Sequence, residues 1–200
     1  MVPPEEVAEV EREEAEKRVL DAAEELFYGQ GIRAVGMDAI RSASAVPLKR
    51  LYQLFPSKDS LIEAYLRRRD ARWLSELAQY VETVESPTQR LLAVFDWLYR
   101  WFSEPGFRGC GFINSFGEMG ATSPAVADIA KAHKQAFRDY VADLVAAAQA
   151  PNWLADQLVL LAEGAMTTAA IHGSPEPARQ AKDAARTLLQ TSRAGTDTPA

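Results

Sequence analysis

Apolar residues recur along most of this chain at the three- and four-residue intervals that place them on one face of a helix. Runs of alternating β-branched residues bounded by turn residues, the usual pattern of strands, are missing. Glycines and prolines separate the periodic segments and mark where helices end and begin. The pattern therefore predicts an all-α fold of about nine helices. They are expected at residues 13–28, starting as early as 7, and at 37–42, 47–54, 57–83, 87–104, 112–119, 124–148, 153–171 and 177–191.

Charge is distributed unevenly along the chain. The 200 residues include 22 Lys or Arg and 28 Asp or Glu, which gives a net charge of −6. Residues 33–72 nevertheless hold nine basic and four acidic residues, so this segment carries +5 and the rest of the chain −11. An acidic protein with one basic segment does not coat nucleic acid indiscriminately, but it offers an anionic partner one local site.

Composition excludes several classes of protein. The single Cys110 cannot close an intramolecular disulfide, and with only His133 and His172 it does not complete a zinc ligand set. We therefore expect no metal and no cofactor. The first residues lack the apolar core of a signal peptide, and Glu163 and Gly164 interrupt the most apolar later segment. We expect a cytoplasmic protein with no membrane segment.

Two short helices, expected at 37–42 and 47–54, follow a longer helix and are joined by a tight turn. This order is typical of a helix-turn-helix, whose second helix enters the major groove of DNA. The inner faces of two crossed short helices need apolar residues. The candidates for these inner positions are Ile40, Ala43, Val46, Leu51 and Phe55.

Polar residues remain on the outer face of the second short helix. Lys and Arg side chains can pair with guanine edges, Gln with adenine, and an apolar side chain with the thymine methyl group. The alternative is that these residues lie on an ordinary solvated helix face. The candidates for base contact are Leu48, Lys49, Arg50 and Gln53, and those for phosphate contact are Tyr52 and Lys58.

The segment IRSASAVPLKRLYQLFPSKDSLIEAYL, residues 40–66, resembles the signature of the tetracycline-repressor (TetR) family of transcriptional regulators. That signature has an Ile-Ala pair, an Ala-Gly-Val-Ser turn, a Leu-Tyr-x-His-Phe recognition helix and Ser-Lys-Glu-x-Leu opening the next helix. The upstream segment LDAAEELFYGQGIRAVGMDAI is similar to the family's first helix and the turn after it. The positions that fit are Ile40, Val46, Leu51, Tyr52, Phe55, Ser57, Lys58 and Leu61.

The chain departs from the signature at several positions. Arg41 replaces an Ala, Ala45 the turn Gly, Pro47 a Ser, Lys49 a frequent Gly and Leu54 the His.

Upstream of these positions, Gly36 stands where the family commonly has a Thr or Ser that caps the helix and contacts a phosphate. The resemblance implies that Gly36 and Met37 lie at the DNA backbone. It also favours a division into an acidic extension (1–12), a helix-turn-helix DNA-binding domain (13–60), a ligand-binding and dimerisation domain (61–192) and a disordered tail (193–200).

The resemblance further implies a small-molecule site in the second domain. Aromatic residues crowd the fifth and sixth expected helices, which supply much of the ligand cavity in that family. An aromatic lining favours an apolar or aromatic effector, with Asn114, Glu118 and Tyr140 as further polar candidates. The alternative is that these residues form the core. The candidate ligand-binding residues are Trp97, Trp101, Phe102, Phe112, Phe116, Met119, His133 and Phe137.

A homodimer is implied as well, and the last two expected helices carry more apolar and small residues than one chain needs. Such stripes would suit a four-helix bundle across a two-fold axis. The alternative is that both stripes face the chain's own core. The candidate interface residues are Leu158, Leu161, Ala165, Met166, Ala169, Ala181, Ala185 and Leu188.

Together these features predict a repressor, not an enzyme, that binds a pseudo-palindromic operator in double-stranded DNA as a homodimer and is released by its effector. A cysteine enzyme would need Cys110, His133 and Glu118 together, but their spacing matches no nucleophile motif. A helical adaptor that binds only protein would leave the basic segment unexplained. Cys110 itself is either a small apolar filler or a redox-active thiol.

Overall fold

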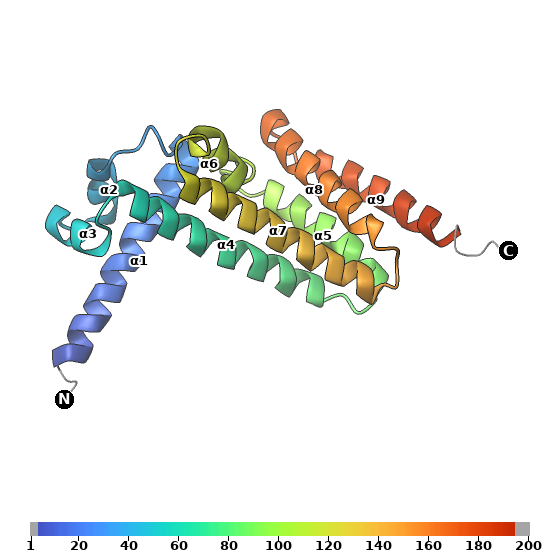
Figure 1. The fold of residues 1–200 in the computed structure, drawn as a ribbon, viewed down its shortest axis with the longest axis horizontal. Coiled ribbons are helices and arrows are strands. Elements are labelled where there is room, and N and C mark those ends of the chain that lie inside the picture. The colour runs from blue at the N-terminus through green and yellow to red at the C-terminus, as the bar shows by residue number, and fades with distance from the viewer. Residues whose placement is uncertain (1–3, 195–200) are drawn as a thin grey trace. The chain divides into compact units, whose positions relative to one another are not determined.

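The computed structural model describes residues 4–194, and over this range the chain forms nine α-helices and no strand (Figure 1). The prediction of an all-α fold is confirmed, and every expected helix is present. The helices are α1 (Pro4–Gln30), α2 (Met37–Ser44), α3 (Leu48–Leu54), α4 (Lys58–Glu82), α5 (Pro87–Phe102), α6 (Gly111–Met119), α7 (Pro124–Ala147), α8 (Trp153–His172) and α9 (Glu176–Ala194).

The two ends of the described chain are more helical than expected. α1 begins at Pro4, so most of the acidic extension 1–12 is part of this helix. Its many glutamates suit the positive N-terminal end of a helix dipole. α9 continues to Ala194. The remainder of the predicted tail, residues 195–200, lies outside the described residues.

The chain packs as two compact units. Unit 1 consists of the residues up to Arg69 together with Gly111–Ala130, and unit 2 consists of Asp70–Cys110 together with the residues from Lys131 onward. The first parts of α4 and α7 belong to unit 1, and so does all of α6. The units therefore differ from the consecutive domains 13–60 and 61–192, because α6 packs with the N-terminal helices.

The core of unit 1 holds the two short helices in place. Ile40 of α2 and Leu51 of α3 are fully buried, and Val46 between them is 1% exposed. The turn is made by Ala45, which has a left-handed backbone with φ of 54°. Ala43 was expected on the inner face, but it is exposed and Ser44 is buried instead.

Ser44 is accommodated because its hydroxyl is hydrogen-bonded within the turn. The Ser44 Oγ accepts from Val46 N at 3.3 Å and donates to Arg41 O at 3.4 Å. A buried hydroxyl is tolerated when its hydrogen bonds are satisfied. The inner face is thus one residue out of the expected register at this point.

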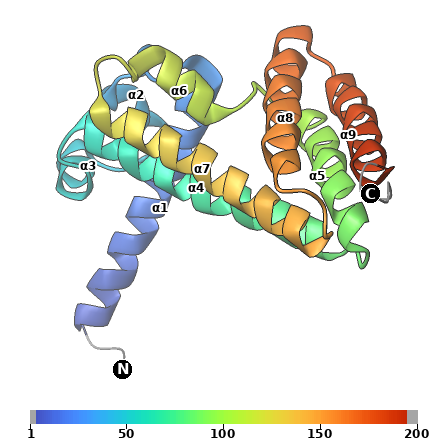
Figure 2. The same ribbon diagram turned by 45° about the vertical axis from the view of Figure 1, so that its right-hand side comes forward.

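Unit 2 is built around α5, α8 and α9, which lie side by side (Figure 2). Small side chains line the contacts, and they let the helix axes approach closely. α8 is also long and apolar enough to cross a membrane by length and composition alone, with a mean hydropathy of 1.2. Core helices of soluble proteins pass the same test. The buried small residues of α8 and α9 are Ala155, Ala162, Ala165, Ala169, Ala178, Ala181 and Ala185.

Candidate functional site

Helix α3 presents its polar residues outward because a single residue anchors it. Leu51 is fully buried and is the one buried residue of this seven-residue helix. Leu48 and Tyr52 are 40% and 45% exposed. Lys49 and Gln53 are exposed as well, whereas Arg50 is half-buried. The predicted base-contact residues therefore share the solvent-facing surface of α3, with Arg50 at its margin.

Ion pairs separate the basic residues of segment 33–72 into two groups. Five of the nine pair with carboxylates: Arg41 with Asp38, Arg67 with Glu63, Arg68 with Asp21 and Glu24, Arg69 with Glu24, and Arg72 with Glu76.

Within the described residues the structure gives no ion pair for the other four, Arg33, Lys49, Arg50 and Lys58. These four lie on α3 or on the segments next to the two short helices. Within segment 33–72, the basic residues that have no ion pair in the described chain therefore lie on or beside the helix-turn-helix.

The start of α2 is the second candidate contact surface of unit 1. Gly36 is the N-cap of α2 with an extended backbone, and no side chain caps the helix there. A Cβ at Gly36 would meet no atom within 4 Å. The absence of a capping side chain leaves backbone N–H groups of the first turn for another acceptor, as at many anion-binding helix N-termini. Met37 follows and is half-buried.

Lys58, the predicted phosphate contact, has a partner within unit 1. Its Nζ donates to the backbone oxygen of Ile32 at 2.6 Å. An ammonium group has three N–H donors, so this bond leaves others for a phosphate. The Ser57 hydroxyl accepts from Ser60 N at 3.0 Å and caps α4 beside it.

The predicted ligand-binding residues are divided between the two units. Phe112, Phe116 and Met119 belong to α6 in unit 1, and the other five belong to unit 2. Phe112 is 1% exposed, whereas Phe116 is 54% exposed and lies against the backbone of Gly120. The aromatic pattern of the sequence therefore combines side chains from two packing units.

In unit 2 the aromatic side chains surround Trp73, a residue that the sequence reasoning did not single out as a site residue. Its ring makes edge-to-face contacts with Trp97 at 5.0 Å, Trp101 at 5.7 Å and Phe137 at 5.3 Å between centroids. The His133 ring lies 5.2 Å from Trp73, and its Nδ1 is 2.7 Å from an oxygen of Asp70. Phe102 adjoins this cluster through Trp101.

Trp97 and Trp101 also line a cavity of about 410 Å³. Its other lining residues are more polar than the expected aromatic cage. They include one carboxylate from α4 and one from the segment just after α5, which the sequence pattern gave no reason to group. The further lining residues are Glu76, Gln79, Tyr80, Arg100 and Glu104.

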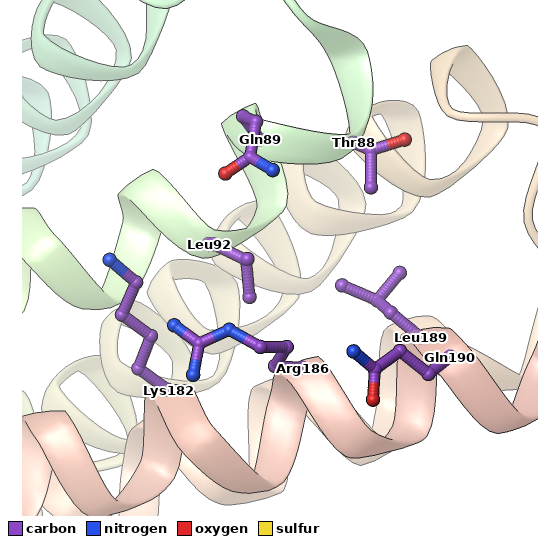
Figure 3. A pocket seen from close by; sticks show the side chains of 7 residues that line it. All are labelled: Thr88, Gln89, Leu92, Lys182, Arg186, Leu189 and Gln190. Carbon is purple, nitrogen blue, oxygen red and sulfur yellow. The ribbon is translucent and has the colours of Figure 1, made fainter.

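A smaller cavity of about 240 Å³ lies between α5 and α9 (Figure 3). Figure 3 shows Leu92 and Leu189 pointing toward each other across it, with the guanidinium of Arg186 between the two helices. Lys182 lines the same cavity and forms an ion pair with Asp96 at 2.6 Å. None of the predicted ligand-binding residues lines this second cavity.

Two other polar candidates have defined surroundings in unit 2. Burial raises the pKa of Tyr140 to about 12, with a further contribution from the charge of Glu82. Cys110 is 4% exposed, and the Lys134 Nζ lies 3.2 Å from its sulfur while also contacting Glu163 at 2.7 Å. Within residues 4–194 no three His, Cys, Asp or Glu side chains gather as metal ligands would.

Two segments of the chain match known protein families. Residues 19–65 match "Bacterial regulatory proteins, tetR family", and residues 87–185 match "Tetracyclin repressor-like, C-terminal domain". A crystal structure of a TetR-family transcriptional regulator from Streptomyces coelicolor is 30% identical and covers 90% of this chain and 96% of that one, with a TM-score of 0.82. The chain belongs to the TetR family of transcriptional regulators.

Other TetR-family relatives extend this similarity. A putative regulator from Streptomyces avermitilis is 28% identical over 86% of this chain and 98% of its own, with a TM-score of 0.73. The HTH-type transcriptional activator FasR of Mycolicibacterium smegmatis is 34% identical over 134 residues, which are 67% of this chain and 60% of FasR. The match to FasR thus spans less than two thirds of that protein.

Membership of the TetR family makes α2 and α3 the DNA-binding helix-turn-helix of a transcriptional regulator. All the predicted base-contact residues lie within the matched segment 19–65. The carboxylate of Glu118, a candidate ligand contact from the sequence, accepts hydrogen bonds from the backbone N–H groups of Ile32 and Arg33. No local pattern could have indicated this contact, because 85 residues or more separate the partners.

Most of the predicted dimer residues of this TetR-family chain pack inside one chain. Leu161 and Leu188 are half-buried. The other six are at most 7% exposed, so side chains of the same chain already cover them. The physical reason is that small side chains allow α8 and α9 to pack tightly. These six are Leu158, Ala165, Met166, Ala169, Ala181 and Ala185.

Proposed function

We propose that this TetR-family regulator binds a pseudo-palindromic operator as a homodimer and that a small molecule bound in unit 2 releases it, so that it acts as a repressor. The observation that carries this proposal is the outward surface of α3, where Lys49, Gln53 and Tyr52 surround the single buried anchor Leu51. The same helix-turn-helix and its flanks carry the four basic residues of segment 33–72 that have no ion pair within the described chain. Such an arrangement combines base contact with phosphate attraction.

The dimer surface that we propose lies on the face of α8 that the chain's own core leaves uncovered. Leu160 is 71% exposed, Ile171 76% and Trp153 49%. Residues separated by seven, eleven or eighteen positions share one helix face, and Gly164 and Thr167 complete this row. An apolar row along a whole helix is typical of a protein interface. A second copy of the chain, related by a two-fold axis, can bury the same row.

The effector site that we propose is the cavity of about 410 Å³ beside Trp97 and Trp101. Its size falls within the roughly 300–1,000 Å³ of small-molecule pockets. The carboxylates and Arg100 add polar groups to the aromatic edge, so an effector with both aromatic and polar parts fits better than a purely apolar one. It releases the operator if it binds the DNA-free arrangement more tightly.

The proposal is tested by selecting fragments from a random DNA pool with the purified protein. We expect the selected sites to be inverted repeats, because a two-fold dimer presents two equal copies of α3. Lys49→Ala should alter the preferred base at symmetric positions. Lys131→Ala, which removes an exposed basic residue outside the matched DNA-binding segment, serves as the control. Selection of non-repeated sites would overturn the two-fold dimer on DNA, and selection of no site would overturn the DNA-binding proposal.

A second measurement tests the effector site. A crude metabolite extract should release the protein from a selected operator, and fractions that do so should quench tryptophan fluorescence through Trp97 and Trp101. Gln79→Phe, at an exposed position lining the cavity, should reduce both effects by partly filling it. Release that persists unchanged in this variant would place the effector elsewhere.

A further inference from the structure

The loop between α1 and α2, residues 31–36, is held by side chains from two distant parts of unit 1. The Glu118 carboxylate of α6 accepts two backbone hydrogen bonds, from Ile32 N at 3.1 Å and from Arg33 N at 2.8 Å. Lys58 at the start of α4 donates to Ile32 O at 2.6 Å. The side chains of Ile32 and Val35 are buried at 1% and 2% exposure. The loop is thus fixed through both its backbone and its apolar side chains.

The carboxylate can approach the loop because residue 31 is a glycine. Gly31 has φ of +90°, a conformation that side chains with a Cβ rarely adopt. A Cβ at this position would lie 3.1 Å from one Glu118 oxygen and 3.3 Å from the other. Two adjacent N–H groups meeting the two oxygens of one carboxylate form charge-assisted hydrogen bonds, which are stronger than neutral ones.

Through its hydrogen bonds, Glu118 links the two segments of the chain that match the N-terminal and C-terminal domains of the TetR family. The loop lies in the matched segment 19–65, whereas Glu118 lies in the matched segment 87–185. α6 follows Cys110 of unit 2 directly and continues through α7 back into unit 2. A residue of the C-terminal part of the chain therefore bonds the backbone just before the first helix of the helix-turn-helix.

We propose that Glu118 is a positioning residue for DNA binding: its carboxylate fixes loop 31–36 and so holds the N-terminus of α2 ready for a phosphate. This inference rests on the DNA contacts proposed above. Gly36 caps α2 without any side-chain bond, and Gly36 and Met37 are the candidate phosphate contacts there. A loop that must be ordered on binding costs conformational entropy, whereas a loop that is already fixed does not.

If Glu118 positions a phosphate contact, its loss should lower the affinity for all DNA and leave the preference for the operator sequence unchanged. Phosphate contacts carry no sequence information, whereas the base contacts come from α3. Loss of the Glu118 carboxylate should therefore weaken binding to operator and random DNA by the same factor, about tenfold, the size expected when hydrogen bonds of this strength are removed. The preferred operator sequence should stay the same.

Whether DNA binding becomes weaker or tighter when Glu118 is replaced distinguishes a positioning role from a purely electrostatic one. Removing a negative charge from a DNA-binding unit strengthens its attraction to phosphates. Positioning predicts the opposite, weaker binding. Asp128→Ala provides the matched control, because Asp128 is an exposed carboxylate of α7 in the same unit and makes no hydrogen bond or ion pair with loop 31–36 in the described chain.

The experiment compares the full-length protein with Glu118→Ala, Glu118→Gln and Asp128→Ala. Affinities for a selected operator and for random DNA are measured together with hydrogen exchange at the amides of Ile32 and Arg33. We expect Glu118→Ala to lose protection at both amides and to bind both DNAs about tenfold more weakly. Glu118→Gln keeps one acceptor oxygen, so it should lose protection at one of the two amides and weaken binding to both DNAs in the same direction. The Asp128 variant should keep the protection and bind as tightly as the wild type or slightly more tightly.

Two results would overturn the inference. One is unchanged protection of both amides in Glu118→Ala. The other is lost protection with unchanged or tighter DNA binding. If Glu118→Ala does not fold, as judged by circular dichroism, Glu118→Gln with the same shape gives the answer. A wild-type protein that binds no DNA would instead contradict the proposed function, so the two failures are distinguishable.

Discussion

Helices α3 and α8 both present residues to solvent, but they bury very different surfaces. α3 buries a single residue, Leu51, and exposes polar or mixed side chains around it. α8 buries seven residues, and it exposes a further apolar row that includes Leu160 and Ile171. α3 has one anchored side, whereas α8 has two apolar sides of which the chain covers one.

This difference shows when an exposed face can be derived from a pattern. A short helix with one apolar anchor has a single possible orientation, so its polar residues must face outward. A helix that is apolar on most of its surface has several possible orientations. The rest of the fold then decides which row of its apolar residues is buried. In α8 one row packs within the chain, and the row that includes Leu160 and Ile171 is left exposed.

The largest expected effect tests which row of α8 belongs to the chain's own core. Ala165→Glu places an unpaired charge at a position that is 5% exposed, which should cost about 3–5 kcal/mol in the free energy of unfolding. Leu160→Glu changes a position that is 71% exposed and should leave the folded chain intact while giving monomers. Urea unfolding and sedimentation measure the two properties. Monomers that retain wild-type stability in Ala165→Glu would reverse the assignment of the two rows.

The sequence predicted the nine helices and the outward residues of α3 because these follow from local spacing. Gly and Pro mark the helix ends, and Leu51 with Phe55 sets the buried side of α3. Three features could not be predicted, because each depends on distant residues. They are the burial of Ser44 in place of Ala43, the placement of α6 in unit 1, and the position of Trp73 at the centre of the aromatic cluster.

The same limit applies to the predicted ligand-binding residues, which stay a prediction. Aromatic side chains at helical spacing look alike whether they form a core or line a cavity. Only Trp97 and Trp101 of the eight predicted residues line the larger cavity, and Glu76 and Glu104 join them from sequence positions without any motif. Tertiary packing, not periodicity, selects among such candidates.

A smaller effect is expected for Gln53→Ala, which tests whether the exposed face of α3 contacts bases. Gln53 is exposed and lies on the same face as Lys49, so Gln53→Ala should remove a base contact worth about 1–3 kcal/mol. The preference at one operator position, and at its symmetric partner, should relax while the stability of the folded protein stays constant. Competition binding with operators changed at single positions measures this. Gln30→Ala, an exposed Gln at the end of α1, is the control. An unchanged preference at every position would show that Gln53 only faces solvent.

The smallest expected effect concerns Lys58, whose ammonium group can make a structural contact and a phosphate contact at the same time. The Nζ donates to Ile32 O, and the side chain is not exposed as fully as Lys49. Lys58→Ala should weaken binding to all DNA sequences by about threefold to tenfold, the range for one net hydrogen bond. If Lys58 also contacts a phosphate, the dependence of binding on salt should flatten by about one counterion, since each neutralised phosphate contributes a slope of about 0.9. If it acts only on the loop, affinity should fall without any change of slope.

Lys17→Ala, which removes an exposed lysine paired with Asp21 on α1, controls for net charge. Binding titrations between low and moderate salt distinguish the two results, and unchanged affinity at every salt concentration would exclude both roles.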